Sequence, residues 1–306
     1  MIEVGKLSTR SASEATSTRS TLHASTLCGA LVAVLCLVLA AEHRAFSAAA
    51  QPSTVRLALV NVPDDVLRPL LAVFREQQGQ SAVISYTGND PFAEGRAGRA
   101  DLVIAHFGHT GVEPFITTGL GLWPKVVFSN QMALIGPSSD PARVRGVRSL
   151  SEAFQRITAT KSRYVANASA GATYLEQIAA AAISSGRPIS IDSGGLENAA
   201  AVRLASERGA YVIWGVPPFL RWKRQQPIEQ ATDLEPLVTD DSTMQRIMVA
   251  IVVNPAAVKG VNSAGATAFQ SFLLSPAIQA RIAAFRYPDF DRQVWWPAGR
   301  HNSARD

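Results

Sequence analysis

The sequence predicts an α/β protein of two lobes, each a doubly wound mixed sheet flanked by helices, joined by β crossovers into a clam-shell. Aliphatic strand-like runs alternate with amphipathic helices twice along the chain, a rhythm typical of parallel, doubly wound sheets. A turn-rich joint, Gly136 to Pro141 (GPSSDP), separates the two alternations. A long β run after the second alternation returns the chain to the first lobe.

The first alternation opens with a strand over Thr54 to Val60. A helix over about Val66 to Gln78 follows, because its leucines and Phe74 recur on one helical face, with Asp64 as a suitable N-cap. The next elements are a strand over Ser81 to Tyr86, a helix over Phe92 to Gly98, a buried strand over Asp101 to Ala105, and β runs over Trp123 to Phe128 and Gln131 to Ile135.

The second alternation begins with a helix capped by Ser149. We expect further strands over Arg163 to Ala166, Ser190 to Asp192 and Ala210 to Trp214, and helices over Ala170 to Ser184, Leu196 to Arg208 and from Gly215 onward. The returning β run covers Arg246 to Val253, and helices cover Ala264 to Leu274 and Pro276 to Phe285. Residues 51–137 with 246–300 are therefore predicted as lobe 1, and residues 138–245 as lobe 2.

The first 50 residues predict a secretory signal peptide. Leu27 to Ala41 is an apolar run of 15 residues behind a tail that carries Lys6, Arg10 and Arg19, and Ala48 to Ala50 offers a small-residue cleavage site. A spanning helix needs about 20 apolar residues, although an uncleaved N-terminal anchor is the alternative. We therefore predict a periplasmic protein.

Cysteine usage and charge exclude several classes. Both cysteines, Cys28 and Cys36, lie in the predicted signal peptide, so the mature chain has no disulfide and no thiolate site. Each follows a leucine, which is atypical of a lipoprotein cleavage site. The net charge of +5 is mild and scattered, which argues against nucleic-acid binding; it suits an anionic ligand or simply solubility.

Seven short segments occur in an order that resembles one family. They are Val55 to Ala58 (VRLA), Arg99 to His106 (RADLVIAH), Asn130 to Pro141 (NQMALIGPSSDP), Glu207 to Tyr211 (ERGAY), Val252 to Pro255 (VVNP), Lys259 to Phe269 (KGVNSAGATAF) and Phe272 to Gln279 (FLLSPAIQ). The order is similar to that of periplasmic tungstate-binding proteins, the substrate-binding subunits of tungstate ABC importers, which are related to molybdate-binding proteins.

The resemblance implies the type II periplasmic-binding-protein fold over the whole mature chain. It also implies a monomer without a cofactor that holds a small oxyanion such as tungstate in its cleft and delivers it to an ABC permease. Three departures weaken the implied ligand. Asn61 is the one side-chain donor in an opening loop that is rich in Ser and Thr in the family, Asn167 replaces an arginine, and Trp214 to Val216 replace a Thr-Asp-Arg stretch.

Candidate ligand-binding residues lie at strand ends and helix starts, where backbone N–H groups and the helix dipole favour an anion. They are Asn61, Thr87, Gly88, Asn89, Asn167, Ser169, Thr173, Ser193, Gly194, Trp214 and Arg246. Helix capping and turn formation explain the Asn, Ser, Thr and Gly residues equally well. The alternatives are core packing for Trp214 and a surface or hinge salt bridge for Arg246.

Three functions remain open on this reading. The first is a solute-binding protein of an ABC importer for a tungstate-like oxyanion. The second is a binding protein re-purposed for a small organic acid, or a sensor without a transporter. An enzyme on the same fold is least favoured, because we identify no catalytic residues. His106 and His109 have the H-x-x-H spacing of some metal sites. We predict no metal there, because no Cys or Glu cluster accompanies the two histidines.

Overall fold

The structure is a computed structural model that describes residues 54–60, 64–183, 190–191 and 193–298, all within one unit of residues 52–306. The predicted signal peptide, residues 1–50, and the candidate Asn61 lie outside the described residues. Within the described ranges, every helix is too short or too polar to cross a membrane.

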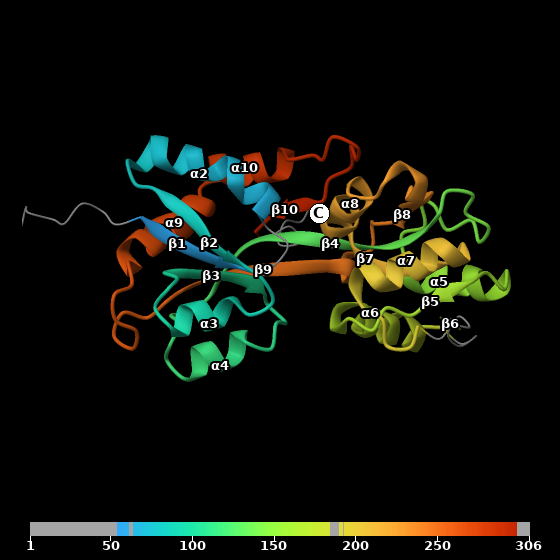
Figure 1. Ribbon diagram of the computed structural model, residues 1–306, viewed down its shortest axis with the longest axis horizontal. Helices are drawn as coiled ribbons and strands as arrows, with labels where there is room; N and C mark the ends of the chain where they lie inside the picture. Colours follow the sequence, from blue (N-terminus) through green and yellow to red (C-terminus); the bar gives the residue numbers. More distant parts are fainter. Residues whose placement is uncertain (1–53, 61–63, 184–189, 192, 299–306) are drawn as a thin grey trace, which may run out of the picture. The chain divides into compact units, whose positions relative to one another are not determined.

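A mixed sheet of ten strands forms the centre of the described chain (Figure 1), and most of its strands follow the order β2-β1-β3-β9-β4-β7-β5-β6. β8 and β10 each pair with β4 outside this order. The strands are β1 (Val55–Leu59), β2 (Ala82–Thr87), β3 (Leu102–His106), β4 (Lys125–Pro137), β5 (Tyr164–Val165), β6 (Ser190–Ile191), β7 (Tyr211–Gly215), β8 (Leu234–Val238), β9 (Gln245–Val252) and β10 (Trp295–Pro297).

Helices flank the sheet, as the alternating pattern predicts. α2 and α3 pack against β2 and β3, α9 packs against β9, and α7 and α8 pack against β7 (Figure 1). The helices are α2 (Asp64–Gln78), α3 (Pro91–Arg96), α4 (Val112–Thr117), α5 (Leu150–Ala159), α6 (Ala170–Ala181), α7 (Asn198–Arg208), α8 (Val216–Arg224), α9 (Ser263–Leu273) and α10 (Pro276–Ala284), with short 3-10 turns at Ile228–Gln230 and Ser242–Met244.

β1 pairs in parallel with β2 and β3, and β5 pairs in parallel with β6 and β7. β9 runs antiparallel to both β3 and β4. These pairings confirm a mixed α/β sheet with helical crossovers. The assignment of residues 51–137 with 246–300 to one lobe, and of residues 138–245 to another, stays a prediction.

β4 connects the two groups of parallel strands. It pairs with β9 over Lys125 to Gln131 and with β7 over Met132 to Ile135. The sequence predicted two runs and a joint from Gly136, but one strand continues from Lys125 through Gly136 to Pro137. The strand continues because both stretches have partners: Asn130 is paired with β9 and β10, and Gly136 with β8, so their backbone groups are hydrogen-bonded without a turn.

Three elements escaped the sequence analysis, namely α4, β8 and β10. Each is only three to six residues long, too short for a clear periodic signal, and both strands depend on pairing with β4. Asp64 is the first residue of α2 instead of its N-cap. Ser149 caps α5 as predicted, accepting a hydrogen bond from the Glu152 N–H at 3.4 Å.

Asp101 ties three parts of this scaffold together at the start of β3. Its fully buried carboxylate accepts hydrogen bonds from the Arg56 guanidinium at 2.6 and 3.1 Å, from the Arg56 N–H at 2.7 Å and from the Asn262 N–H at 2.8 Å. Burial raises the pKa of Asp101, but these hydrogen bonds outweigh burial and hold the pKa below its ordinary value.

We expect Asp101→Asn to lower the free energy of unfolding by about 2–4 kcal/mol, because it breaks a buried, charge-assisted network. Urea denaturation measures the change. Glu94→Gln is the matched control, since it breaks the more exposed Arg99–Glu94 pair and is expected to change stability by less than about 1 kcal/mol. Equal effects of the two substitutions would contradict the central role of Asp101.

Candidate functional site

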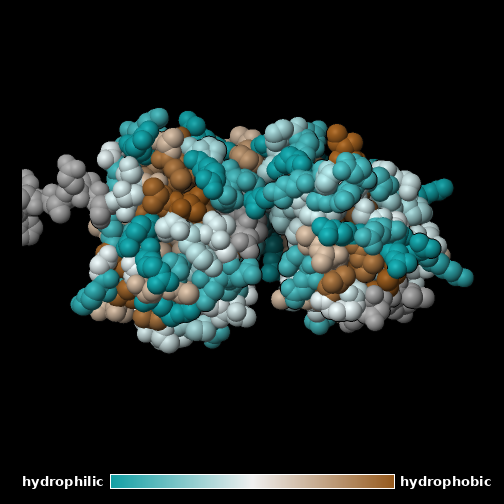
Figure 2. Space-filling view, viewed as in Figure 1, coloured by the Kyte–Doolittle hydropathy of each residue, from teal (hydrophilic) through white to brown (hydrophobic). Residues whose placement is uncertain are grey.

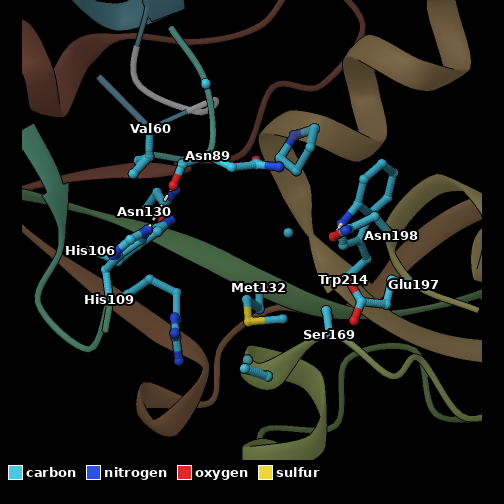
Figure 3. Close-up of a pocket in the computed structure, with 16 residues that line it drawn as sticks. Val60, Asn89, His106, His109, Asn130, Met132, Ser169, Glu197, Asn198 and Trp214 are labelled. Carbon is cyan, nitrogen blue, oxygen red and sulfur yellow. Dashed lines mark hydrogen bonds between the residues drawn. The ribbon is translucent and has the colours of Figure 1, made fainter. Parts of the chain in front are cut away.

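A pocket of about 660 Å³ lies between the sheet and the starts of three helices. Figure 2 shows the surface hollowed between the atoms over α3 and α4 and those over α6. The close-up in Figure 3 shows Asn130 and both histidines on one wall and Ser169, Asn198 and Trp214 on the other. The residues that line it are Val60, Gly88, Asn89, His106, His109, Asn130, Met132, Ser169, Ala170, Gly171, Glu197, Asn198, Trp214, Gly215, Pro218 and Arg246.

Strand register brings three polar side chains of the sheet wall together. His106 of β3 lies opposite Met248 of β9, and Asn130 of β4 lies opposite Arg246 of β9. Side chains two residues apart on a strand share a face, as do directly opposed residues. His106, Arg246 and Asn130 therefore occupy one face of three neighbouring strands, and all three line the pocket.

Arg246 carries an uncompensated charge in this wall. Among the described residues, no hydrogen bond or ion pair joins its guanidinium to an acceptor, so the salt bridge considered from the sequence is not formed there. Burial lowers the pKa of Arg246 below its ordinary value. The acid that lines the pocket, Glu197, is exposed and belongs to the helix wall.

The N-terminus of α6 faces this guanidinium. Ser169 occupies the N-cap, yet its hydroxyl makes no capping hydrogen bond, and the first N–H groups of a helix have no acceptor inside it. A Cβ placed on Gly171 would lie 3.5 Å from Cζ and Nη2 of Arg246 and 3.3 Å from Sδ of Met132. A cation and the positive end of a helix dipole thus meet in one place, which favours an anion between or beside them.

Asn167 lies behind the pocket and organises its helix wall. The side chain is 1% exposed and does not line the pocket. Its Nδ2 donates to the Ile213 carbonyl at 3.0 Å, while its Oδ1 accepts from the N–H groups of Ser169 at 3.1 Å and Asn198 at 3.0 Å. This residue, predicted as a ligand donor, joins the end of β7 to the starts of α6 and α7.

The two histidines of the H-x-x-H segment differ in their environment. His109 Nε2 donates to the Asn89 carbonyl at 2.9 Å and its Nδ1 accepts from the Gly111 N–H at 3.0 Å, so both nitrogens have hydrogen-bond partners. Nδ1 of His106 is buried without a hydrogen-bond partner among the described residues. Burial, followed by the charges of Arg246 and His109, lowers the pKa of His106 to about 3, and its imidazole is neutral at pH 7.

Five of the predicted ligand-binding residues line the pocket: Gly88, Asn89, Ser169, Trp214 and Arg246. Five described ones do not line it: Asn167, which lies behind the pocket as described above, and four others. Thr87 is exposed at the end of β2, Thr173 is exposed on α6, and Ser193 and Gly194 lie in the turn before α7.

The sequence analysis missed several pocket residues, notably Asn130, Asn198 and Met132. One signal pointed to Asn130: it belongs to a run of three polar residues, 129–131, inside a mostly apolar strand. The structure buries it to 3% exposure and leaves its Oδ1 without a hydrogen-bond partner among the described residues.

The remaining wall of the pocket is apolar. Trp214 is 8% exposed and belongs to the hydrophobic core, which supports core packing; it also borders the pocket, and its role in ligand binding stays a prediction. Its indole N–H donates to Oδ1 of Asn198 at 3.2 Å. At the start of α8, Pro217 and Pro218 have no N–H, so this helix offers few donors to a ligand.

The described chain thus combines a mixed α/β sheet, with antiparallel strands between two groups of parallel strands, and a pocket against helix N-termini. The solved tungstate-binding protein from Desulfovibrio alaskensis G20 has the same fold: the TM-score is 0.65, at 21% identity, over 80% of this chain and 98% of that one. The predicted α/β fold class with a mixed sheet and flanking helices is confirmed, and the two-lobe arrangement stays a prediction.

The sequence comparisons point to particular relatives within this class. A tungstate-binding protein of Peptoclostridium acidaminophilum is 24% identical over 235 residues, 74% of this chain and 79% of that protein. A putative ABC transporter anion-binding protein of Haloferax volcanii is 26% identical over 239 residues, 76% of this chain and 67% of that protein. No protein-family model matches the chain. The resemblance to tungstate-binding proteins is confirmed.

We expect the half-buried, neutral His106, whose Nδ1 is buried, to make stability fall in acid. Its folded pKa of about 3 lies below the unfolded value of about 6.5, so the unfolded chain takes up the proton first. The contribution of neutral His106 to the free energy of unfolding is complete above a pH of about 6.5. It is lost, at up to about 1.4 kcal/mol per pH unit, as the pH falls toward the folded pKa.

His106→Gln removes this contribution. Urea denaturation at pH 7 and pH 5 is expected to show that the wild-type protein loses about 2 kcal/mol more than the variant over this interval. The comparison is of slopes, so a constant effect of the substitution on stability does not affect it. Parallel pH dependences in the two proteins would contradict a neutral His106 with a buried Nδ1.

Proposed function

We propose that the protein is an extracytoplasmic solute-binding protein that binds a small oxyanion of the tungstate type and delivers it to an ABC importer by closure of its cleft. One observation carries this proposal: the guanidinium of Arg246 faces the N-terminus of α6 without a carboxylate partner among the described residues. The names of the relatives, which bind tungstate or anions for transporters, support the ligand class and the permease partner.

An oxyanion that enters the pocket loses its hydration and needs donors in return. Arg246 supplies a delocalised cation with several N–H groups in a planar fork. The N–H groups of Ala170 and Gly171 supply neutral donors in the first turn of α6, where the helix dipole adds to the attraction. The anion in turn gives Arg246 the counter-charge that no described residue supplies.

Location and partners follow from the same proposal. In this proposal the predicted signal peptide directs export to the periplasm, where the protein acts as a monomer without a lipid anchor and delivers its ligand to an ABC permease subunit. The relatives are named as binding proteins, which supports binding over catalysis. A sensor without a transporter remains the second candidate, since the same pocket serves both functions.

Calorimetric titration of the exported protein with tungstate, molybdate and sulfate tests the ligand class. We expect at least one of these ions to bind, and Arg246→Met to weaken that binding at least 100-fold. Arg281→Met is the matched control, because Arg281 is exposed on α10 and does not line the pocket. No binding heat from any ion, or full affinity in Arg246→Met, would overturn the proposal.

Gly171→Ala tests the helix N-terminus separately from the arginine. The added methyl group would occupy space against Arg246 and Met132, while alanine is a better helix former than glycine by up to about 1 kcal/mol. We therefore expect an affinity at least tenfold lower together with unchanged or higher thermal stability. Unchanged affinity would show that the anion does not bind at the start of α6.

A further inference from the structure

The lining of the pocket combines polar groups from both walls with an apolar part. Arg246 and Asn130 of the sheet wall and the start of α6 on the helix wall are together called the anion site below. Trp214 and Pro218 form an apolar shelf on the helix wall. Figure 3 shows Val60 on the opposite wall beside Asn89 and Asn130, and Met132 between the two walls. A bare oxyanion has identical oxygens all round and uses only the anion site.

From this asymmetry we infer that the pocket takes an oxyanion that carries an organic substituent, namely a sulfonate, phosphonate or carboxylate with a small apolar or aromatic group. The inference rests on the proposed function, because it keeps the anion at Arg246 and α6. It adds that the substituent lies on the apolar shelf and raises the affinity.

The volume of the pocket is the first observation that supports an organic substituent. An ion of four oxygens needs on the order of 100 Å³, taking about 30 Å³ for each water-sized group. The pocket measures about 660 Å³, within the range of about 300–1,000 Å³ that is typical of sites for organic ligands, which pair apolar walls with a few placed polar groups. Most of the volume is therefore available to a substituent.

The construction of the shelf is the second support. Pro218 packs closely on Gly215, where a Cβ would lie 2.9 Å from its Cγ, and so the proline ring covers the first turn of α8. Since Pro217 and Pro218 have no N–H, this helix start, unlike that of α6, presents carbon to the pocket. The hydrogen bond from the indole N–H of Trp214 to Asn198 satisfies the polar edge of the ring and orients its carbon edge.

Charge narrows the ligand class further. Glu197 is the acid that lines the pocket, and it belongs to the helix wall together with Asn198 and Trp214. A second anionic group on the ligand would approach this carboxylate and be repelled. We therefore expect ligands with one anionic head and an uncharged substituent, and weaker binding of dicarboxylates.

The test compares four probes on the exported protein by calorimetry: tungstate, sulfate, methanesulfonate and benzenesulfonate. The two sulfonates share a head group and differ in the substituent. We expect benzenesulfonate to bind at least tenfold more tightly than methanesulfonate and sulfate, and Arg246→Met to abolish the binding of all probes.

Two variants of equal burial separate the shelf from general packing. Trp214 and Trp222 are each 8% exposed, but Trp222 does not line the pocket. Trp214→Leu is expected to remove the preference for benzenesulfonate over methanesulfonate, whereas Trp222→Leu keeps it. Trp214→Phe retains an aromatic ring and is expected to keep most of the preference, so the inference remains testable if the leucine variant does not fold.

The outcomes distinguish this inference from the function on which it rests. Binding of tungstate or sulfate, with benzenesulfonate no tighter, would overturn the organic ligand and leave the oxyanion-binding protein intact. A preference for benzenesulfonate that persists in Arg246→Met or in Trp214→Leu would also overturn it, since the ring would then bind elsewhere. No binding heat from any of the four probes would overturn both the organic ligand and the oxyanion-binding function.

Discussion

The meeting of Arg246 with the N-terminus of α6 is the constraint on which the rest of the site depends. Two positive groups face each other there, and no described carboxylate lies between them to neutralise either one. Such an arrangement is unfavourable in a folded chain, because burial of an unpaired charge weakens stability. The scaffold sustains it with buried networks elsewhere, of which the hydrogen bonds at Asp101 are the clearest.

Two residues position the start of α6 relative to Arg246: Asn167 behind the pocket and Gly171 in its lining. Asn167 uses both ends of its side chain to join β7 to the starts of α6 and α7, so the anion site and the apolar shelf are fixed relative to each other. Gly171 has no side chain, which lets the start of α6 approach the guanidinium of Arg246; any side chain there would fill the space between them. The positions of these helix starts thus depend on the side chain of Asn167, whose nitrogen and oxygen are both hydrogen-bonded.

The histidines show how one scaffold separates two similar residues. Both ring nitrogens of His109 are hydrogen-bonded, one to the Asn89 carbonyl and one to the Gly111 N–H, so His109 connects two loops. His106 lacks such partners and is kept neutral by burial and by the nearby cation. The pocket therefore keeps its positive charge on Arg246, where a delocalised guanidinium suits an oxyanion better than an imidazolium would.

The sequence by itself determined the α/β alternation, the cap of α5 at Ser149 and the kinship with tungstate-binding proteins, because these depend on local pattern and on segment order. It also placed Arg246 and Ser169 among the candidates. Only the tertiary structure decided that Asn130, Arg246 and His106 share one face, and that Asn167 lies behind the pocket and joins the starts of two helices. Strand order and register join residues more than 100 positions apart, and pairing between such distant segments leaves no periodic trace in the sequence around either one.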